Sequence, residues 1–422
     1  MTVAVPKIWI SVWQAPYRPL FLLAGLWALV APAVWLLPEG TGPEPIAWHR
    51  HELLFGMTSA AAGGYLLTAL PSWTKSGPVP SAVTLFVTCL WCAARLTAVF
   101  SDHLPFVVAA VGASAYFVCL TVILTHAVVS SGAWHRLWAP LAMAALGANA
   151  LSLVAQGVSI MSTPLLYIVL IILVGGRAVP AFTRRWLDRT GAGPLRDRPA
   201  LSYLATAGVL ATASIEVFRQ HPVSGYVLMF SGVLLALQIT GWQSVSTYRY
   251  PALFMLHLAF AWTPAGLILT GLAAVSPDQI APAAALHALT MGAMGTMMAA
   301  IMMRSAMRRD GAGLIANGTM ACAIGLVSLS ALLRVLAGLP GEAHVDAVVA
   351  AAICWMAAWT LFLVAYIPAL MGPVPRPVFS AAIGDRAERI APFDRGVDRP
   401  DERTICRSGL NRRCSERTLS ND

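Results

Sequence analysis

The stretch IAWHRHELLFGMTSAAAGGYLLTALPSWT, residues 46–74, passes from a polar loop into a long apolar run. A helix needs about 20 consecutive apolar residues to cross a bilayer core, so this run is long enough to span a membrane. His49, His51 and Glu52 stand where the polar loop ends. Either these residues cap the start of a membrane helix, or they bind something there.

The rest of the chain has the same character. Its 422 residues are 58% hydrophobic and 11% charged, with a mean hydropathy of +0.70, whereas an ordinary soluble domain carries about 25% charged residues. The composition therefore predicts an all-α polytopic membrane protein. The length rule predicts 12 transmembrane helices, at residues 19–37, 49–73, 79–100, 104–130, 135–156, 160–183, 199–220, 222–243, 251–275, 281–307, 314–337 and 345–371.

Basic and acidic loops alternate along the chain. Because positive loops stay in the cytoplasm, both termini are predicted to be cytoplasmic, which agrees with the even number of spans. The net charge of +9 is spread over these loops, so it does not indicate nucleic-acid binding. The leader lacks a small-residue cleavage site, so no removable signal peptide is expected. The basic residues of the predicted cytoplasmic loops are Lys7, Arg18, Lys75, Arg136, Arg184–Arg198, Arg249 and Arg304–Arg309. The acidic residues of the predicted outer loops are Glu39, Glu44, Asp102, Asp278 and Glu342.

The seven cysteines do not form a disulfide framework, because none lies in a predicted outer loop. Cys89 and Cys92 share a helix face and could chelate copper, but buried free cysteines in an apolar helix are more often small hydrophobic residues. Residues 376–422 are rich in Arg, Asp, Pro and Ser. They predict a disordered cytoplasmic tail after a membrane domain of residues 1–375.

The spans divide into three groups of four, each opening with an arginine at a helix start, in YRPLFLLAG, HRLWAPLAM and YRYPALFML. The second helices of the first and third groups align HELLFG with HALTMG, which puts His51 and Gly56 in register with His287 and Gly292. Three parallel repeats are one interpretation, and chance similarity of apolar segments is the other. The third helix of each group carries one ionisable residue near its outer end, namely Arg95, Glu216 and Arg334.

Ionisable side chains inside a bilayer are costly unless they are paired, ligated or facing water, so each one in a predicted span is a functional candidate. His287 lies about six residues inside its helix, roughly 9 Å below the outer boundary. Met291, Met294 and Met298 follow it on one face, which suits haem or Cu(I), although packing is the favoured explanation for the methionines. The ionisable residues within the predicted spans are His49, His51, Glu52, Arg95, His126, Arg177, Glu216, His257, His287 and Arg334.

His257 lies about six residues from the opposite, cytoplasmic end of its span, so it is not expected to share a metal with His287. Arg177 lies at a similar depth beside Gly175 and Gly176, which would let a bulky group approach. A haem propionate would be one partner for Arg177, and another buried group is the alternative.

His49 and His51 point about 200° apart if both are helical. Two geometries remain: either His49 lies in a turn before the helix and the two chelate one metal, or they serve two centres on opposite faces. Glu52, three residues after His49, is expected to orient that ring as a hydrogen-bond acceptor. Helix capping accounts for Trp48, which suits the membrane interface.

Five motifs together resemble the NnrS family of haem- and copper-containing bacterial membrane proteins, in order along residues 15–371: PYRPLFLLAGLWAL, WHRHELLFGMTSAAAGGYLLTALPSWT, LVGGRAVPAFTRRWL, LHLAFAWTPAGL and HALTMGAMGTMMAAIMMR. The resemblance implies an inner-membrane protein of denitrification and the nitric oxide response, which lessens nitrosative stress. It implies haem and copper as cofactors, with ligands His49, His51, His257 and His287 and with Arg177 in support. After Pro375 the chain shows no further resemblance.

Three functions are compatible with these features. The first is a haem- and copper-binding protein that binds or converts nitric oxide or protects cellular iron, with an electron donor that the sequence does not identify. The second is a respiratory-type nitric oxide reductase, which would need more histidines at membrane depth than the chain offers. The third is a secondary transporter, with copper passing along the methionine face.

Overall fold

The structure is a computed structural model that describes residues 11–38, 43–156, 162–216, 222–311, 313–339 and 344–379. Within these ranges, 11 helices are long and apolar enough to cross a membrane. The strands among the described residues are β1 (Arg308–Asp310) and β2 (Gly313–Ile315), which pair as one antiparallel hairpin. The prediction of an all-α polytopic membrane protein is confirmed.

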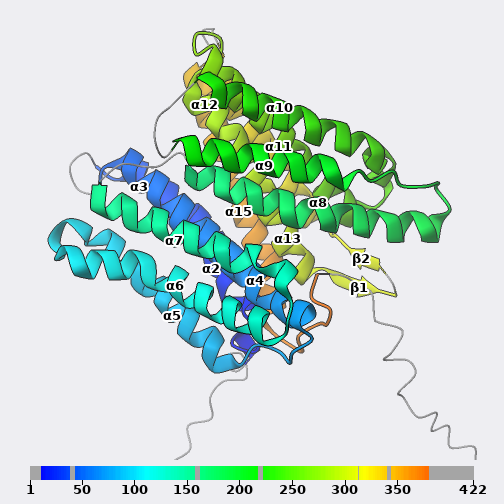
Figure 1. Ribbon diagram of the computed structural model, residues 1–422, viewed down its shortest axis with the longest axis horizontal. Coiled ribbons are helices and arrows are strands. Elements are labelled where there is room, and N and C mark those ends of the chain that lie inside the picture. The colour runs from blue at the N-terminus through cyan, green and yellow to red at the C-terminus, as the bar shows by residue number, and fades with distance from the viewer. Residues whose placement is uncertain are drawn as a thin grey trace, which may run out of the picture. The chain divides into compact units, whose positions relative to one another are not determined.

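The helices follow the predicted spans closely (Figure 1). Two of the spans contain a π-helical stretch between two α-helices, and short 3₁₀ turns lie in the connections. The elements are α2 (Tyr17–Val30), η1 (Ala31–Leu36), α3 (Pro45–His51), π-helix η2 (Glu52–Met57), α4 (Thr58–Thr74), α5 (Ser81–Val99), η3 (Ser101–His103), α6 (Phe106–Ser130), η4 (Trp134–Arg136), α7 (Trp138–Gln156), α8 (Ser162–Thr190), α9 (Pro199–Glu216), α10 (Pro222–Ile239), η5 (Thr240–Trp242), η6 (Ser244–Arg249), α11 (Pro251–Val275), α12 (Pro282–His287), π-helix η7 (Ala288–Gly295), α13 (Thr296–Ala306), α14 (Gly318–Leu336), α15 (His344–Tyr366) and η8 (Ile367–Leu370).

One predicted span, at residues 199–220, is not among these 11 helices, because the mean hydropathy of its described residues is too low. It corresponds to α9, which is 18 residues long and contains several serines and threonines. These side chains lower its hydropathy, but α9 still packs between α8 and α10 (Figure 1). The membrane bundle therefore consists of 11 clearly apolar helices with α9 packed among them.

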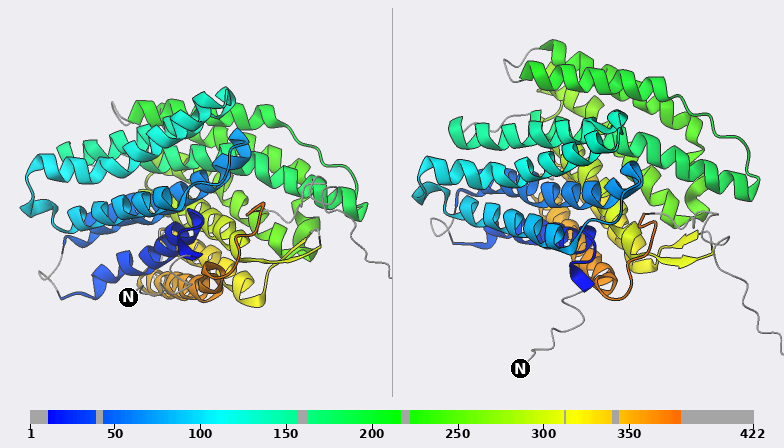
Figure 2. Two further views of the ribbon diagram at one scale, coloured as in Figure 1. Left: turned by 90° about the horizontal axis from the view of Figure 1, so that it is seen from below. Right: turned by 60° about the horizontal axis from the view of Figure 1, so that its bottom comes forward.

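Contacts between helices follow the division into three groups of four. Within each group, neighbouring helices pack together, and the last helix of one group packs against the first helix of the next. These junctions pair α6 with α7, α10 with α11, and α15 with α2. The third junction joins helices from opposite ends of the chain (Figure 2), so the three groups close into a ring.

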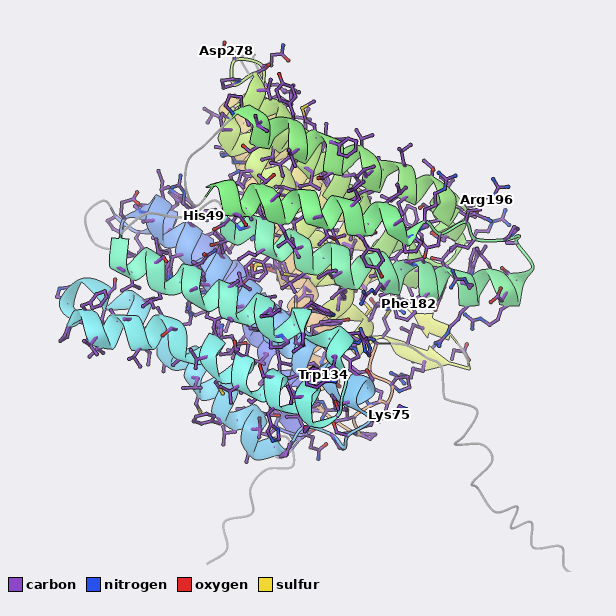
Figure 3. The ribbon with its side chains drawn as sticks, viewed as in Figure 1. His49, Lys75, Trp134, Phe182, Arg196 and Asp278 are labelled. Carbon is purple, nitrogen blue, oxygen red and sulfur yellow. The ribbon has the colours of Figure 1, made fainter. Side chains whose placement is uncertain are left out.

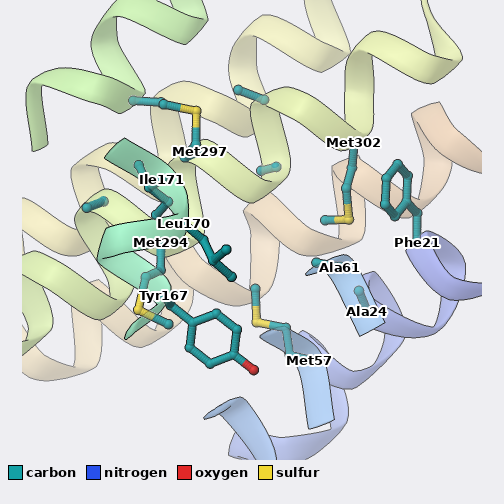
Figure 4. Packing of buried hydrophobic residues seen from close by; sticks show 14 of the residues in the cluster. Phe21, Ala24, Met57, Ala61, Tyr167, Leu170, Ile171, Met294, Met297 and Met302 are labelled. Atoms are coloured by element: carbon teal, nitrogen blue, oxygen red, sulfur yellow. The ribbon is translucent and has the colours of Figure 1, made fainter. Parts of the chain in front are cut away.

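The second helix of each group lies at the centre of this ring. In the apolar 18-residue stretch of each span, the share of buried residues is 78% for 45–74, 61% for 162–190 and 67% for 282–306. The share is also 61% for α11, and it is 28% to 44% for the other candidate spans. Figure 4 shows the core where these helices meet, with Ala61 from α4, Leu170 from α8, and Met297 and Met302 from α13.

The two ends of the helices differ in charge. His49 and Asp278 lie toward one end, and Lys75 and Arg196 lie toward the other (Figure 3). We call the first the outer end and the second the inner end, after the topology that the loop charges predict.

Residues 376–379 were predicted to belong to the tail but pack against the inner ends of the helices. Arg309 donates hydrogen bonds to the carbonyl oxygens of Pro377 and Val378, and the ring of Phe379 lies 5.2 Å from that of Tyr65. The membrane unit therefore includes the start of the predicted tail. Residues 380–422 lie outside the described part of the chain.

Candidate metal centre at the outer end

Two helices are π-helical directly after a candidate histidine. In the first group η2 begins at Glu52, immediately after His51, and in the third group η7 begins at Ala288, immediately after His287. In the second group α8 is α-helical throughout. Isolated π-helical stretches are rare and occur often at functional sites. The shared interruption supports the alignment of HELLFG with HALTMG.

A glycine in each π-helix packs against a tryptophan from the first helix of its group. A Cβ on Gly56 would lie 2.5 Å from the indole of Trp27, and a Cβ on Gly292 would lie 2.5 Å from the indole of Trp262. Glycine is needed at both positions because a side chain would overlap the indole. The sequence analysis missed both tryptophans, although each precedes its glycine by a similar interval, which is a signal it could have used.

His49 is helical, since α3 runs from Pro45 to His51. The geometry in which His49 sits in a turn and chelates with His51 is therefore wrong, and the two rings point to different surroundings. The ring of His49 lies 6.4 Å from that of His287, centre to centre, with 29° between their planes. The ring of Trp35 also packs against His49, at 4.7 Å. The repeat alignment pairs His51 with His287, but the ring that packs near His287 is that of His49.

Both rings of this pair leave a nitrogen available for a ligand. Nδ1 of His287 lies 2.5 Å from the carbonyl oxygen of Ala283, and because a carbonyl only accepts, Nδ1 must carry the proton. In the neutral ring, Nε2 of His287 then keeps its lone pair. Nδ1 of His49 is buried and has no hydrogen-bond partner among the described residues. An unpartnered buried nitrogen is costly, so a bound group at this position would remove a penalty.

Glu52 orients His51, and the expectation that it orients His49 is wrong. Its carboxylate accepts hydrogen bonds from Nδ1 of His51 at 2.6 Å, from Nη1 of Arg95 at 3.0 Å and from Nε1 of Trp27 at 2.5 Å. Arg95 on α5 and Trp27 on α2 hold the fully buried carboxylate toward those helices and away from the His49 pair. His51 donates through Nδ1 and keeps Nε2 free, an arrangement found in many metal-binding histidines.

Arg334 lies near the pair and has no carboxylate partner. Its charge acts electrostatically on both His49 and His287. Among the residues that the structure describes, it makes no hydrogen bond or ion pair.

His257 lies apart from this site with both ring nitrogens occupied. Thr183 donates to the carbonyl of Val179, so its oxygen accepts from Nε2 of His257 at 2.8 Å, and Nδ1 then accepts from the hydroxyl of Ser244 at 2.8 Å. Along α11, His287 is level with Gly266, because a Cβ there would touch Ala288 and Leu289. Nine residues separate Gly266 from His257, or about 14 Å. The two histidines belong to different regions, and His257 could bind a metal only by giving up a hydroxyl partner.

Arg177 is exposed and also lies away from the histidine pair. Its Nη2 is 3.4 Å from the hydroxyl of Tyr203, and its guanidinium is 5.9 Å from the centre of that ring. The space beside the adjacent glycines is used for helix packing, since a Cβ on Gly175 would meet the ring of Phe260 at 2.9 Å.

Other candidate ligands do not gather around a common point. Among the described residues, no group of three or more His, Cys, Asp or Glu side chains is placed to hold a metal. Cys89 and Cys92 are exposed on α5. Of the three methionines that follow His287, Met294 is buried in the hydrophobic core (Figure 4), and Met291 and Met298 are half-buried and pack against that core, in agreement with the packing interpretation.

The spacing of the two rings would let His49 and His287 hold one metal ion together. A metal–nitrogen bond of about 2.0 Å puts a ring centre about 3 Å from the ion, so the centres of two ligating rings lie no more than about 6 Å apart. The separation of 6.4 Å between His49 and His287 is close to this value. The donor set suits haem iron or copper, because imidazole binds both.

A family model described as NnrS protein matches residues 11–373 of the chain. No curated protein matches it.

Proposed function

Since the chain belongs to the NnrS family and is a multi-pass membrane protein of the nitric oxide response, we propose that it binds haem and copper and lessens nitrosative stress. It would do so by binding or converting nitric oxide or by protecting cellular iron. We place its principal metal centre between His49 and His287. Following the loop charges, the bundle would lie in the bacterial inner membrane with both termini in the cytoplasm and this centre near the outer face.

One observation carries the assignment of the centre. His49 and His287 come from different helices, and their ring centres are 6.4 Å apart. Among the described residues, Nδ1 of His49 is buried without a partner, and Nδ1 of His287 is bonded to a carbonyl, which leaves Nε2 of His287 with its lone pair. Structural histidines satisfy both nitrogens, as His257 does with two hydroxyl groups. The pair instead has the free nitrogens that a metal needs.

A haem iron or copper ion held there would supply a site where nitric oxide binds directly and where electrons can be exchanged. The surrounding residues have separate tasks. Trp35 packs on His49 and would help to hold its ring in place. Arg334 supplies a positive charge that would attract an anionic group beside the centre.

His51 and Glu52 form a second element of the site. His51 holds a proton at Nδ1, and Glu52 is fixed by Arg95 and Trp27. A side chain oriented in this way is prepared to bind a second metal through Nε2. The proposal thus assigns His49 and His51 to two centres, on opposite faces of α3.

Optical spectra and metal analysis of purified variants test the assignment. His49→Ala and His287→Ala should each lower the bound haem or copper by about tenfold or more, because each removes half of the ligand pair. His126 is exposed on α6, so His126→Ala is the matched control and should leave haem and copper content unchanged. Loss of the Soret band in the pair variants assigns haem, and loss of copper with an unchanged band assigns copper.

The variant His257→Ala distinguishes this proposal from one in which every buried histidine is a ligand. We expect it to keep its metals, since Thr183 and Ser244 already occupy both nitrogens of His257. Full haem and copper content in both His49→Ala and His287→Ala would refute the proposed centre.

A further inference from the structure

A cavity of about 420 Å³ lies at the inner end of the helices. It is lined by residues of α4, α8 and α13, by residues 14–16, and by residues 374 and 376–379. Its size falls in the range of small-molecule sites, roughly 300–1,000 Å³. Arg304, on its wall, is 17 residues after His287, or about 25 Å along the helix. The cavity is therefore separate from the proposed metal centre.

The walls of this inner cavity are mainly apolar and aromatic, with Trp73, Phe182 and Phe379 among them. A smaller cavity of about 60 Å³ shares Tyr65 and Met297 with it and extends among the core side chains seen in Figure 4. The two cavities are thus neighbours, the larger at the inner end and the smaller in the apolar centre of the bundle.

Arg304 is the buried charge on the cavity wall, with 4% of its surface exposed. Its Nε donates to the carbonyl oxygen of Phe379 at 3.0 Å, and its Nη1 donates to that of Ala252 at 2.5 Å. The guanidinium also lies 4.5 Å from the ring centre of Phe182. Each of these partners is neutral, and Nη2 has no hydrogen-bond partner among the described residues.

The described residues contain no anion that balances Arg304. Both ion pairs within them use Glu52, at the other end of the bundle. Carbonyl groups satisfy hydrogen bonds but leave the net charge, and a buried charge without a counter-charge is costly. An anion in the cavity would remove that cost and engage Nη2.

We propose that the inner cavity binds one anionic amphiphile, a molecule with a carboxylate or phosphate head on an apolar body. The head pairs with Arg304. The apolar body lies along Tyr65 and Met297 toward the smaller cavity. A bare inorganic anion would leave the apolar walls without contacts, and a neutral apolar molecule would leave Arg304 unbalanced. Arg376, exposed at the rim, adds a second positive charge that would attract the head.

Full-length protein in phosphatidylcholine nanodiscs tests this proposal. Oleate and phosphatidylglycerol are the two probes, oleyl alcohol is the uncharged control, and inorganic phosphate is the control without an apolar body. Native mass spectrometry should show one bound molecule of oleate or phosphatidylglycerol, with a higher Tm. Binding of oleate alone indicates a free carboxylate ligand, binding of phosphatidylglycerol alone indicates a membrane lipid, and binding of both supports the shared chemistry.

Two variants and a matched control locate the site. Arg304→Gln removes the charge, and Ala178→Phe fills the cavity while keeping the arginine; each should weaken probe binding by about tenfold or more. Arg309→Gln is the control, because Arg309 also holds the 377–379 segment but does not line the cavity. If Arg304→Gln fails to fold, Ala178→Phe decides. Unchanged binding in Ala178→Phe, binding of neither probe, or equal binding of oleyl alcohol or inorganic phosphate would overturn the proposal.

Discussion

The first and third groups of helices share a backbone device but differ in their chemistry. Each has a π-helical stretch directly after a histidine, with a glycine packed against a tryptophan of the group's first helix. In the first group, Glu52 follows the histidine and pairs with Arg95 on the third helix. In the third group, Ala288 occupies the position of Glu52, and Arg334 on the third helix has no partner among the described residues.

This difference shows that two groups with the same backbone feature can pair their ionisable side chains differently. The first group has a closed ion pair, whose charges are satisfied within the protein. In the third group, Arg334 has no partner among the described residues. The backbone interruption is common to both groups, and the difference between them lies in the side chains around it.

The largest change in stability should come from breaking the buried ion pair of Glu52 with Arg95. Arg95→Met would leave Glu52 buried without its cation, so we expect the free energy of unfolding to fall by about 3–5 kcal/mol. Arg334→Met should change it by less than about 1 kcal/mol, since no partner among the described residues is lost. Denaturant titration in detergent measures both. The double variant Glu52→Gln with Arg95→Met should recover most of the loss, and equal costs for the two arginines would contradict the comparison.

The packing of a glycine against a tryptophan should contribute equally to stability in both groups. Gly56→Val and Gly292→Val would each drive a side chain into a tryptophan, and each should cost about 1–3 kcal/mol of stability. Gly325→Val is the control, because a Cβ there meets nothing within 4 Å. Thermal unfolding of the three variants checks this. A large cost for only one of the first two would show that the groups do not share the packing.

Replacing the two tryptophans should again cost the first group more stability than the third, but by a smaller difference. Trp27 donates to the Glu52 carboxylate, whereas Trp262 donates to the hydroxyl of Ser328 at 2.8 Å. Trp27→Phe should cost about 1.5–3 kcal/mol and Trp262→Phe about 0.5–1.5 kcal/mol, because hydrogen bonds to charged groups are stronger. The same unfolding assay ranks them, and a reversed order would count against the geometry around Glu52.

The smallest effect concerns how the two histidine helices begin. Glu44 accepts hydrogen bonds from the backbone of Ala47 and Ile46 at the start of α3, whereas α12 begins after Ala281 without a side-chain cap. Those N–H groups hold the pKa of Glu44 below its usual range. A lowered pKa means that the cap contributes at neutral pH and is lost as the pH falls through the folded-state pKa.

Amide hydrogen exchange across residues 46–51 measures this effect. Glu44→Ala should speed exchange in α3 at neutral pH and have little effect once the wild-type carboxyl is protonated. The start of α12 should show no such pH dependence. The absence of any change in α3 at neutral pH would show that the cap does not hold the helix.

Much of the site was accessible from the sequence because ionisable residues stand out in apolar spans. His49, His51, Glu52 and His287 were found in this way, and all lie at the outer end of the bundle. The pairing among them was not predicted correctly. Helix periodicity placed Glu52 beside His49, but Arg95 and Trp27, from two other helices, turn the carboxylate toward His51.

What the sequence alone determined was the class of protein, the position of nearly every helix and the set of unusual polar side chains. These follow from local properties, since the length of an apolar run and the cost of a buried charge can be judged one segment at a time. Tertiary structure decided which histidine meets His287, and it decided that Arg304 lines a cavity without a counter-charge. Both depend on how helices distant in the chain are rotated and packed, and a π-helical stretch shifts that rotation away from an α-helical count.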